Sequence, residues 1–233
     1  MEDSFDQNSC DSCFKRTHSL FRHLNEDEIQ NIIFNKITES YKRGSVIYQE
    51  GHRMKGFFCV QNGIIKIYKT GFDGKEQIIR FAKPGDIIGY RSVLSNETAC
   101  TSTEVVEDCV VCHIPAATLF NLVKENGNFA LELMKLTCKE LGEANSYITD
   151  IAQKTVRERL AEILVHLQDE FGMDEAGILK ISLTREELSN IVGTATESVI
   201  RLLSEFKTEK LIELNGRKIK ILDKPGLKLI ANI

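Results

Sequence analysis

The pattern of apolar and polar positions first predicts a β-rich region between Tyr41 and Pro115. Short apolar runs, rich in β-branched and aromatic residues, alternate there with glycine-containing turns. The strand candidates are Val46-Ile47, 57–60, 64–68, 78–81, 87–88 and 110–114, and the turn candidates are Gly44, Gly51, Asn62-Gly63, Asp73-Gly74 and 84–86. Short strands at this spacing predict an antiparallel β-barrel or jelly roll.

A long helical pattern follows the predicted barrel. Its seam residues recur at alternate spacings of three and four: Leu131, Met134, Cys138, Leu141, Asn145, Ile148 and Ala152. Such a heptad seam predicts a two-stranded coiled coil, and hence a homodimer with the residues from Leu131 to Ile148 at its interface. The polar Asn145 is a residue type that fixes register and oligomer number. The alternative is a helix that lies on its own barrel.

Two capped helical patterns come next, after an amphipathic stretch through Val156, Leu160, Ile163, Leu164 and Leu167. Thr184 and Glu187 have the spacing of a capping box, which starts a helix at Thr184. Gly193 allows a tight turn, and Thr194 and Glu197 repeat the spacing to open a second helix over 194–208. Two helices joined by a short turn predict a helix-turn-helix.

The second of these helices has two different faces. Its apolar positions are Val199, Leu202, Leu203 and Phe206, and the opposite side carries Thr196, Glu197, Ile200, Arg201 and Ser204. In a DNA major groove an Arg can donate twice to guanine, a Glu can accept from cytosine, and an Ile can contact a thymine methyl. We therefore expect the polar side to face DNA bases. The alternative is that Glu197 only caps the helix and Arg201 is only solvated.

A hairpin pattern closes this region. Residues 211–214 alternate into Asn215-Gly216, a signal for a two-residue type I′ turn, and residues 217–221 alternate back out. We expect a wing on which Arg217, Lys218 and Lys220 neutralise phosphates, which contributes affinity but little sequence preference.

The charge distribution favours nucleic-acid binding by one part of the chain only. The chain has 233 residues and a net charge of −4, whereas residues 180–233 hold ten Lys/Arg and seven Asp/Glu, or +3. The first 179 residues therefore carry −7. No apolar run approaches the ~20 residues that cross a bilayer, and the polar N-terminus lacks a signal-peptide core. We expect no membrane partner, a cytoplasmic location and reduced thiols.

This order of parts resembles the Crp/Fnr family of bacterial transcription regulators over nearly the whole chain. The most specific match is 183–188 (Leu-Thr-Arg-Glu-Glu-Leu) followed by 197–201 (Glu-Ser-Val-Ile-Arg). The resemblance implies an α+β fold: a cyclic-nucleotide-binding-like barrel domain (1–125), a dimerisation helix (126–153) and a winged helix-turn-helix domain (154–233). It also implies a dimer that reads palindromic double-stranded DNA through Glu197 and Arg201, with Thr196 and Ile200 as modulators and RNA polymerase as a partner.

The resemblance does not extend to the cyclic AMP slot. Family members that bind cyclic AMP place a Glu after a barrel glycine and an Arg about ten residues later. Here Tyr90 follows Gly89, the later position falls in 98–100 without a cation, and Ala144-Asn145 replaces hydroxyl residues of the dimer helix. We therefore expect no cyclic AMP. Arg91 serves either a different anion or only the surface.

The cysteines suggest a metal site. Cys10, Cys13 and Cys112 match positions at which oxygen-sensing Fnr proteins ligate an iron–sulfur cluster, but the family's remaining cysteine position falls on Ser19. His18 could supply the missing ligand. Cys109 could too, although it lies three residues from Cys112 on a strand and so should face the opposite side. The open alternatives are a cluster, a thiol switch or structural zinc, and no cysteine role. Cys59 and Cys138 are expected to be packing residues, and Cys100 is unassigned.

Other function classes have less support. The five histidines are His18, His23, His52, His113 and His166, and they do not form the pairs that a cupin-like metal enzyme uses. Nucleophile-elbow, phosphate-loop and dinucleotide motifs are absent from the sequence. We expect no enzyme. A barrel sensor that acts through protein partners or an unidentified small ligand remains an alternative.

Overall fold

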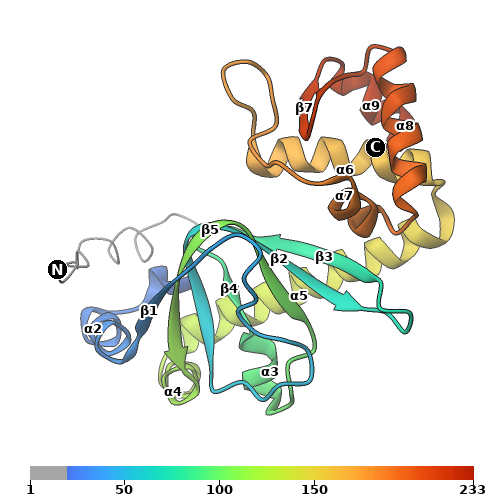
Figure 1. Ribbon diagram of the computed structural model, residues 1–233. Helices are drawn as coiled ribbons and strands as arrows, with labels where there is room; N and C mark the ends of the chain where they lie inside the picture. The colour runs from blue at the N-terminus through green and yellow to red at the C-terminus, as the bar shows by residue number, and fades with distance from the viewer. Residues whose placement is uncertain (1–19) are drawn as a thin grey trace. The chain divides into compact units, whose positions relative to one another are not determined.

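The computed structural model describes residues 20–233, which form two compact units (Figure 1). The first holds residues up to 70 and 79–141, and the second holds 71–78 and 142–233. The predicted ligands Cys10, Cys13 and His18 lie outside the described residues. Within residues 20–233, none of the helices has the length and apolar character to cross a membrane.

The first unit is built on a five-stranded sheet that curls on itself (Figure 1). The strand order is β1-β5-β2-β3, with β4 paired to β2. The pairs β1–β5, β2–β5 and β2–β4 are antiparallel. The bounds are β1 Ile37–Tyr41, β2 Gly56–Thr70, β3 Glu76–Ala82, β4 Ile87–Ile88 and β5 Ser102–Pro115. The predicted antiparallel β domain and α+β class are therefore confirmed. The pair Val46-Ile47 was expected to be a strand, but only an isolated bridge from Val46 to Glu104 forms there.

The predicted turn at Asn62-Gly63 is wrong. Residues 57–60 and 64–68 belong to the single strand β2, whose register against β5 shifts on both sides of Asn62. Gly63 has φ +83° and donates its N–H to Asn62 Oδ1 at 2.7 Å, and a Cβ there would lie 2.5 Å from the carbonyl oxygen of Asp108. The Asn-Gly pair thus makes a bulge that lets β2 bend closely over β5.

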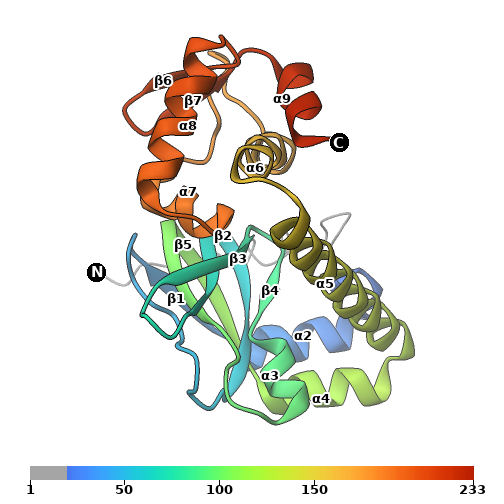
Figure 2. The ribbon, with the colours of Figure 1, turned by 90° about the vertical axis from the view of Figure 1, so that its right-hand side faces the viewer.

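Two apolar cores hold the first unit together. One lies inside the curled sheet and includes Tyr48, Val60, Ile65, Val105 and Val111. The other joins the outside of the sheet to a set of helices: η1 Leu20–His23, α2 Glu26–Asn35, α3 Tyr90–Ser95, α4 Ala116–Glu125 and the start of α5. Figure 2 shows α2, α3 and α4 grouped at one end of the sheet. These short helices were not predicted.

The helix α5 spans Gly127–Gln153, so the predicted helix over 126–153 is confirmed to within one residue. Its Phe129 and Leu133 are buried in the second core of the first unit. The predicted seam lies elsewhere on the helix and is exposed: Leu131 47%, Met134 57%, Leu141 62% and Ile148 65%. The helix therefore packs on its own domain through one face and leaves the seam uncovered within one chain.

The second unit contains the predicted helix-turn-helix and hairpin. Its elements are α6 Val156–Phe171, α7 Arg185–Val192, α8 Thr196–Thr208, β6 Ile212–Asn215, β7 Lys218–Ile221 and α9 Lys224–Ala231. Leu160, Leu164 and Leu167 of α6 are buried, as its amphipathic pattern indicates. The helix α9 was not predicted. Its N-cap is Asp223, whose Oδ1 accepts the Gly226 N–H at 2.8 Å, and the helix packs against α6.

Candidate nucleic-acid interface

The start and end of α7 are fixed by local hydrogen bonds. The N–H of Glu187 donates to Thr184 Oγ1 at 3.0 Å, and the N–H of Thr184 donates to Glu187 Oε2 at 2.6 Å. This reciprocal pair is the predicted capping box. The helix ends at Gly193, whose left-handed backbone (φ +71°) suits a residue without a side chain. The turn to α8 is therefore short, as predicted.

The second predicted capping box is wrong. The N-cap of α8 is Ala195, which makes no side-chain cap, and the helix begins at Thr196 rather than Thr194. Thr194 instead continues the turn, since its N–H donates to the Ser189 carbonyl at 3.1 Å. The Thr196 hydroxyl lies 3.0 Å from that of Ser189. Because Thr194 does not pair with Glu197, the Glu197 side chain is not used as a capping group.

The outer face of α8 is exposed and mixed in character. Val199, Leu202, Leu203 and Phe206 are at most 4% exposed and point into the unit. Glu197, Ile200, Arg201 and Ser204 are exposed, with Ile200 at 51% and the Arg201 side chain at 68%, whereas Thr196 is half-buried. This face carries one acid, one base and one aliphatic side chain, which together can contact the edges of several bases.

Sequence reasoning missed Glu205 as a partner of Arg201. Arg201 Nη1 donates to Glu205 Oε1 at 2.7 Å, and Glu205 also meets Arg157 of α6. The spacing of four residues along the helix was the available signal.

The hairpin forms with its turn one residue later than predicted. Asn215 pairs with Lys218, so the loop residues are Gly216 and Arg217. Only Gly216 has a positive φ (+58°), which excludes a type I′ turn and agrees with the preference of type II′ for glycine in the first central position. Arg217 and Lys218 are exposed, and Lys220 is half-buried with its Nζ 3.8 Å from Glu213. Arg185 Nη2 donates to the Gly216 carbonyl at 2.7 Å and so ties the start of α7 to the hairpin.

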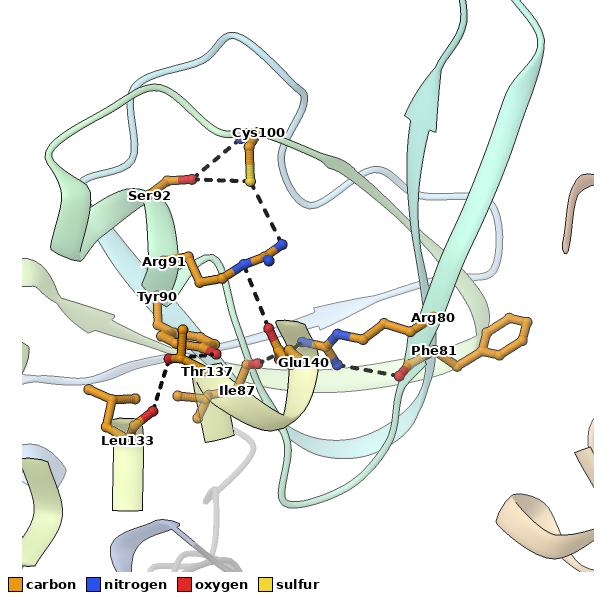
Figure 3. Close-up of polar contacts among 10 residues, drawn as sticks. All are labelled: Arg80, Phe81, Ile87, Tyr90, Arg91, Ser92, Cys100, Leu133, Thr137 and Glu140. Atoms are coloured by element: carbon orange, nitrogen blue, oxygen red, sulfur yellow. Dashed lines mark hydrogen bonds and ion pairs between the residues drawn. The ribbon is translucent and has the colours of Figure 1, made fainter. Parts of the chain in front are cut away.

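In the first unit, two arginines converge on one carboxylate (Figure 3). Arg80 Nη2 lies 2.9 Å from Glu140 Oε1, and Arg91 Nε lies 3.6 Å from Glu140 Oε2. The Glu140 side chain is only 9% exposed. Beside it, burial raises the pKa of Tyr90 to about 12, so this phenol stays protonated. Arg91 is exposed, as the surface alternative expects, with its side chain at 45%, and it also pairs with Glu140.

This arrangement does not fit a cyclic nucleotide. Its phosphate would compete with Glu140 for the arginines, and Tyr90 stands where a ribose-binding Glu is needed. Cys100 lies in the same cluster, with its Sγ 3.8 Å from Arg91 Nη2 and 3.9 Å from Ser92 Oγ (Figure 3). Sequence reasoning missed Arg80 and Glu140, because no local spacing pattern links either residue to Arg91.

The cysteines of the sheet divide between its two cores. Cys59 and Cys112 pair across β2 and β5 and belong to the core under the helices, whereas Cys109 belongs to the core inside the curled sheet. The expectation that Cys59 packs in the core is confirmed, and so is the opposite facing of Cys109 and Cys112. Burial raises the pKa of Cys109 to about 11, which disfavours the thiolate that metals bind.

Among Cys10, Cys13, His18 and Cys112, only Cys112 lies within the described residues. It is 7% exposed, and its Sγ lies 3.6 Å from Lys36 Nζ and 3.7 Å from Thr38 Oγ1. Among residues 20–233, no three His, Cys, Asp or Glu side chains gather as a metal site. Cys138, expected to pack in the seam, is exposed on α5 within a single chain.

Two family profiles match the chain, one in each part. A profile described as "Cyclic nucleotide-binding domain" matches residues 38–126, and one described as "Crp-like helix-turn-helix domain" matches residues 158–230. The first match covers the curled sheet with α4, and the second runs from α6 to α9.

Several named proteins are similar over most of this chain. "Electron transport regulator A" of Shewanella oneidensis is 29% identical over 95% of this chain and 90% of its own length. "Fumarate and nitrate reduction regulatory protein" of Yersinia pestis is 28% identical over 89% and 84%. "Transcriptional activator protein Anr" of Pseudomonas protegens is 28% identical over 82% and 78%.

Solved structures show the same architecture. FixK2 of Bradyrhizobium japonicum superposes with a TM-score of 0.75 at 25% identity, covering 84% of this chain and 96% of FixK2. A Crp/Fnr-family transcriptional regulator of Thermus thermophilus gives a TM-score of 0.70 at 26% identity, covering 84% and 99%.

Proposed function

We infer that this chain, which belongs to the Crp/Fnr family of transcription regulators, works as a homodimer that reads a palindromic DNA site with α8. Glu197 and Arg201 contact bases, Thr196, Ile200 and Ser204 adjust the preference, and Arg217, Lys218 and Lys220 bind phosphates. Two subunits place the half-sites about one helical turn apart. This function needs access to chromosomal DNA, so we place the protein in the cytoplasm, with RNA polymerase as a partner and no catalytic step.

The observation that carries this proposal is the outward face of α8. Glu197 and Arg201 are exposed on a helix whose other side is fully packed, and the turn before it is fixed by a capped α7. A helix-turn-helix presents its second helix to the major groove in this way.

Selection from a randomised duplex library tests the proposal. We expect the wild-type protein to enrich a palindrome, and gel shifts to give much weaker binding to a random-sequence duplex at the same salt. A wild-type protein that enriches no motif and binds all duplexes equally would contradict sequence reading. Binding to no DNA at all would favour a sensor that acts through protein partners.

The exposed seam of α5 supports the homodimer. We propose that Leu131, Met134, Cys138, Leu141, Asn145 and Ile148 meet the same residues of a second copy. Asn145→Leu removes the polar seam residue and is expected to tighten or change self-association, whereas Ser146→Ala, beside the seam, should not. Sedimentation that finds the same monomer for wild type and both variants would refute the seam.

We propose redox or oxygen as the signal. The names of the relatives refer to electron transport and to fumarate and nitrate reduction. Cys10, Cys13 and Cys112 would supply thiolates to an iron–sulfur cluster, and His18 the remaining ligand; such a cluster supplies oxygen-sensitive one-electron chemistry. Of these residues only Cys112 is described, and its neighbour Lys36 places positive charge beside its sulfur.

Protein purified without oxygen tests this signal. We expect visible absorbance together with iron and sulfide by analysis, and loss of all three in Cys112→Ala but not in Cys100→Ala. Zinc alone would favour a structural site, and protein without metal would leave a thiol switch or a small-ligand sensor.

A further inference from the structure

The side chain of Glu205 stands between two arginines in the second unit. Its Oε1 accepts from Arg201 Nη1 at 2.7 Å, and its Oε2 accepts from Arg157 Nη1 at 3.2 Å. Arg201 lies on the outer face of α8, whereas Arg157 belongs to α6, which packs behind α8. The Glu205 carboxylate therefore links the solvent-exposed Arg201 to Arg157 of α6.

Arg157 is itself held firmly. Its Nη2 donates to both carboxylate oxygens of Glu209, at 2.8 and 2.7 Å, and its guanidinium carbon lies 4.9 Å from the ring centre of Phe206. Phe206 is fully buried. The ion pair, in which one nitrogen contacts both oxygens of Glu209, and the cation–π contact together restrict this guanidinium. Glu205 is thus oriented by a fixed partner rather than by its own helix alone.

The order of Arg201 and Glu205 along α8 also favours a role for Arg157 in orienting Glu205. Arg201 precedes Glu205 by four residues, and isolated helices favour the reverse order, with the acid first. The contact of Glu205 with Arg157 supplies an additional reason for its carboxylate to face Arg201.

We propose that Glu205 is a specificity-determining residue that positions Arg201 for one base pair and opposes binding to DNA of other sequences. The contact occupies one donor of Arg201 and leaves the others for guanine, so the long side chain enters the groove already oriented. The negative charge of Glu205 repels phosphates, and a correct base contact compensates for that repulsion. This inference rests on the proposed role of Arg201 in base reading.

Glu209 provides a matched control. Glu205→Gln and Glu209→Gln remove the same charge, one within α8 and one at its C-cap. Both carboxylates contact Arg157, but only Glu205 contacts Arg201. Glu205→Asp keeps the charge and shortens the reach. Thermal melting of all three variants checks folding, which surface substitutions of this kind leave intact.

The experiment compares affinity for the selected palindrome with affinity for a random-sequence duplex at one salt concentration. For Glu205→Gln we expect this ratio to fall about tenfold, with lost preference at the base pair that Arg201→Ala also affects. Glu205→Asp should show the same loss, and Glu209→Gln should retain the wild-type base preferences. If Glu205→Gln and Glu209→Gln change the affinity ratio equally, the effect comes from net charge alone and the proposal is overturned.

The remaining outcomes separate this inference from the proposed function. If Arg201→Ala loses one base preference while Glu205→Gln keeps it, positioning by Glu205 is wrong and base reading by Arg201 stands. If Arg201→Ala keeps every preference of a wild-type protein that selects a motif, both assignments fail. A wild-type protein that selects no motif contradicts the proposed function itself.

Discussion

The arginines of the two units are used in different ways. In the first unit, Arg80 and Arg91 share the carboxylate of Glu140, whose side chain is 9% exposed. In the second, Arg201 pairs with Glu205, but its own side chain remains 68% exposed. An external anion must displace a nearly buried acid to reach the first pair, whereas Arg201 still presents donors to the solvent.

The two ion-pair arrangements have different consequences, one for stability and one for binding. A buried carboxylate between two cations is costly to leave unpaired, so Glu140 fixes α5 to the sheet and α3. A surface ion pair contributes little to stability, so Arg201 is free to exchange one partner for another. Arg80 and Arg91 therefore contribute to packing within the first unit, whereas Arg201 of the second unit remains accessible to an external anion.

The largest expected effect comes from breaking the internal cluster. Glu140→Ala leaves Arg80 and Arg91 without their shared acid, and we expect a loss of about 2–3 kcal/mol in the free energy of unfolding, less than for a fully buried pair because Arg91 is 45% exposed. Urea denaturation measures it, with Ser146→Ala on the exposed side of α5 as the control. Equal stability of the two variants would mean that the cluster is only a surface pair.

Arg201→Ala tests the exposed arginine of the second unit. We expect a loss of about 1–3 kcal/mol in binding to the selected site, a relaxed preference at one base pair, and unchanged unfolding. Binding titrations on sites that differ at that position provide the measurement. A uniform loss on all sequences would show that Arg201 contacts only the DNA backbone.

The raised pKa of Cys109 gives a smaller, pH-dependent effect in the first unit. Burial raises this pKa to about 11, so the unfolded thiol ionises first as pH rises, and the stabilisation present at neutral pH is lost between the unfolded and folded pKa values. Relative to Cys109→Ala, the wild type should lose about 1 kcal/mol between pH 7 and pH 10. A constant difference across that range would indicate that Cys109 is not shielded from solvent.

The smallest expected effect belongs to the hairpin. Lys218→Ala should weaken binding to all duplexes alike and reduce the slope of log affinity against log salt by about 1. Titrations at several salt concentrations measure this slope, and Lys210→Ala provides a comparison outside the hairpin. A base-dependent effect of Lys218→Ala would contradict a phosphate contact.

The parts that the sequence predicted well are those specified locally. The capping box of Thr184 and Glu187, the apolar spacing of α8 and the helical pattern of α5 each depend on residues a few positions apart. Such patterns also located the exposed face that carries Glu197 and Arg201. The Cys112 assignment came from family resemblance and not from local spacing.

The errors arise where distant segments decide the outcome. Asn62-Gly63 has the chemistry of a turn, yet pairing with β5 on both sides keeps it within one strand. The error at Thr194 has a local cause instead, because its N–H donates to the Ser189 carbonyl five residues earlier. Glu140 meets Arg80 and Arg91 only after the sheet, α3 and α5 assemble, and its place in the sequence carries no sign of that contact.

The position of Gly142 within α5 has a mechanical consequence. The division between the two units falls between Leu141 and Gly142, inside a helix that continues to Gln153. A glycine in a helix interior costs about 1 kcal/mol relative to alanine, and nothing lies within 4 Å of the place a Cβ would take. The backbone of α5 is therefore most easily distorted at the turn where one unit passes into the other.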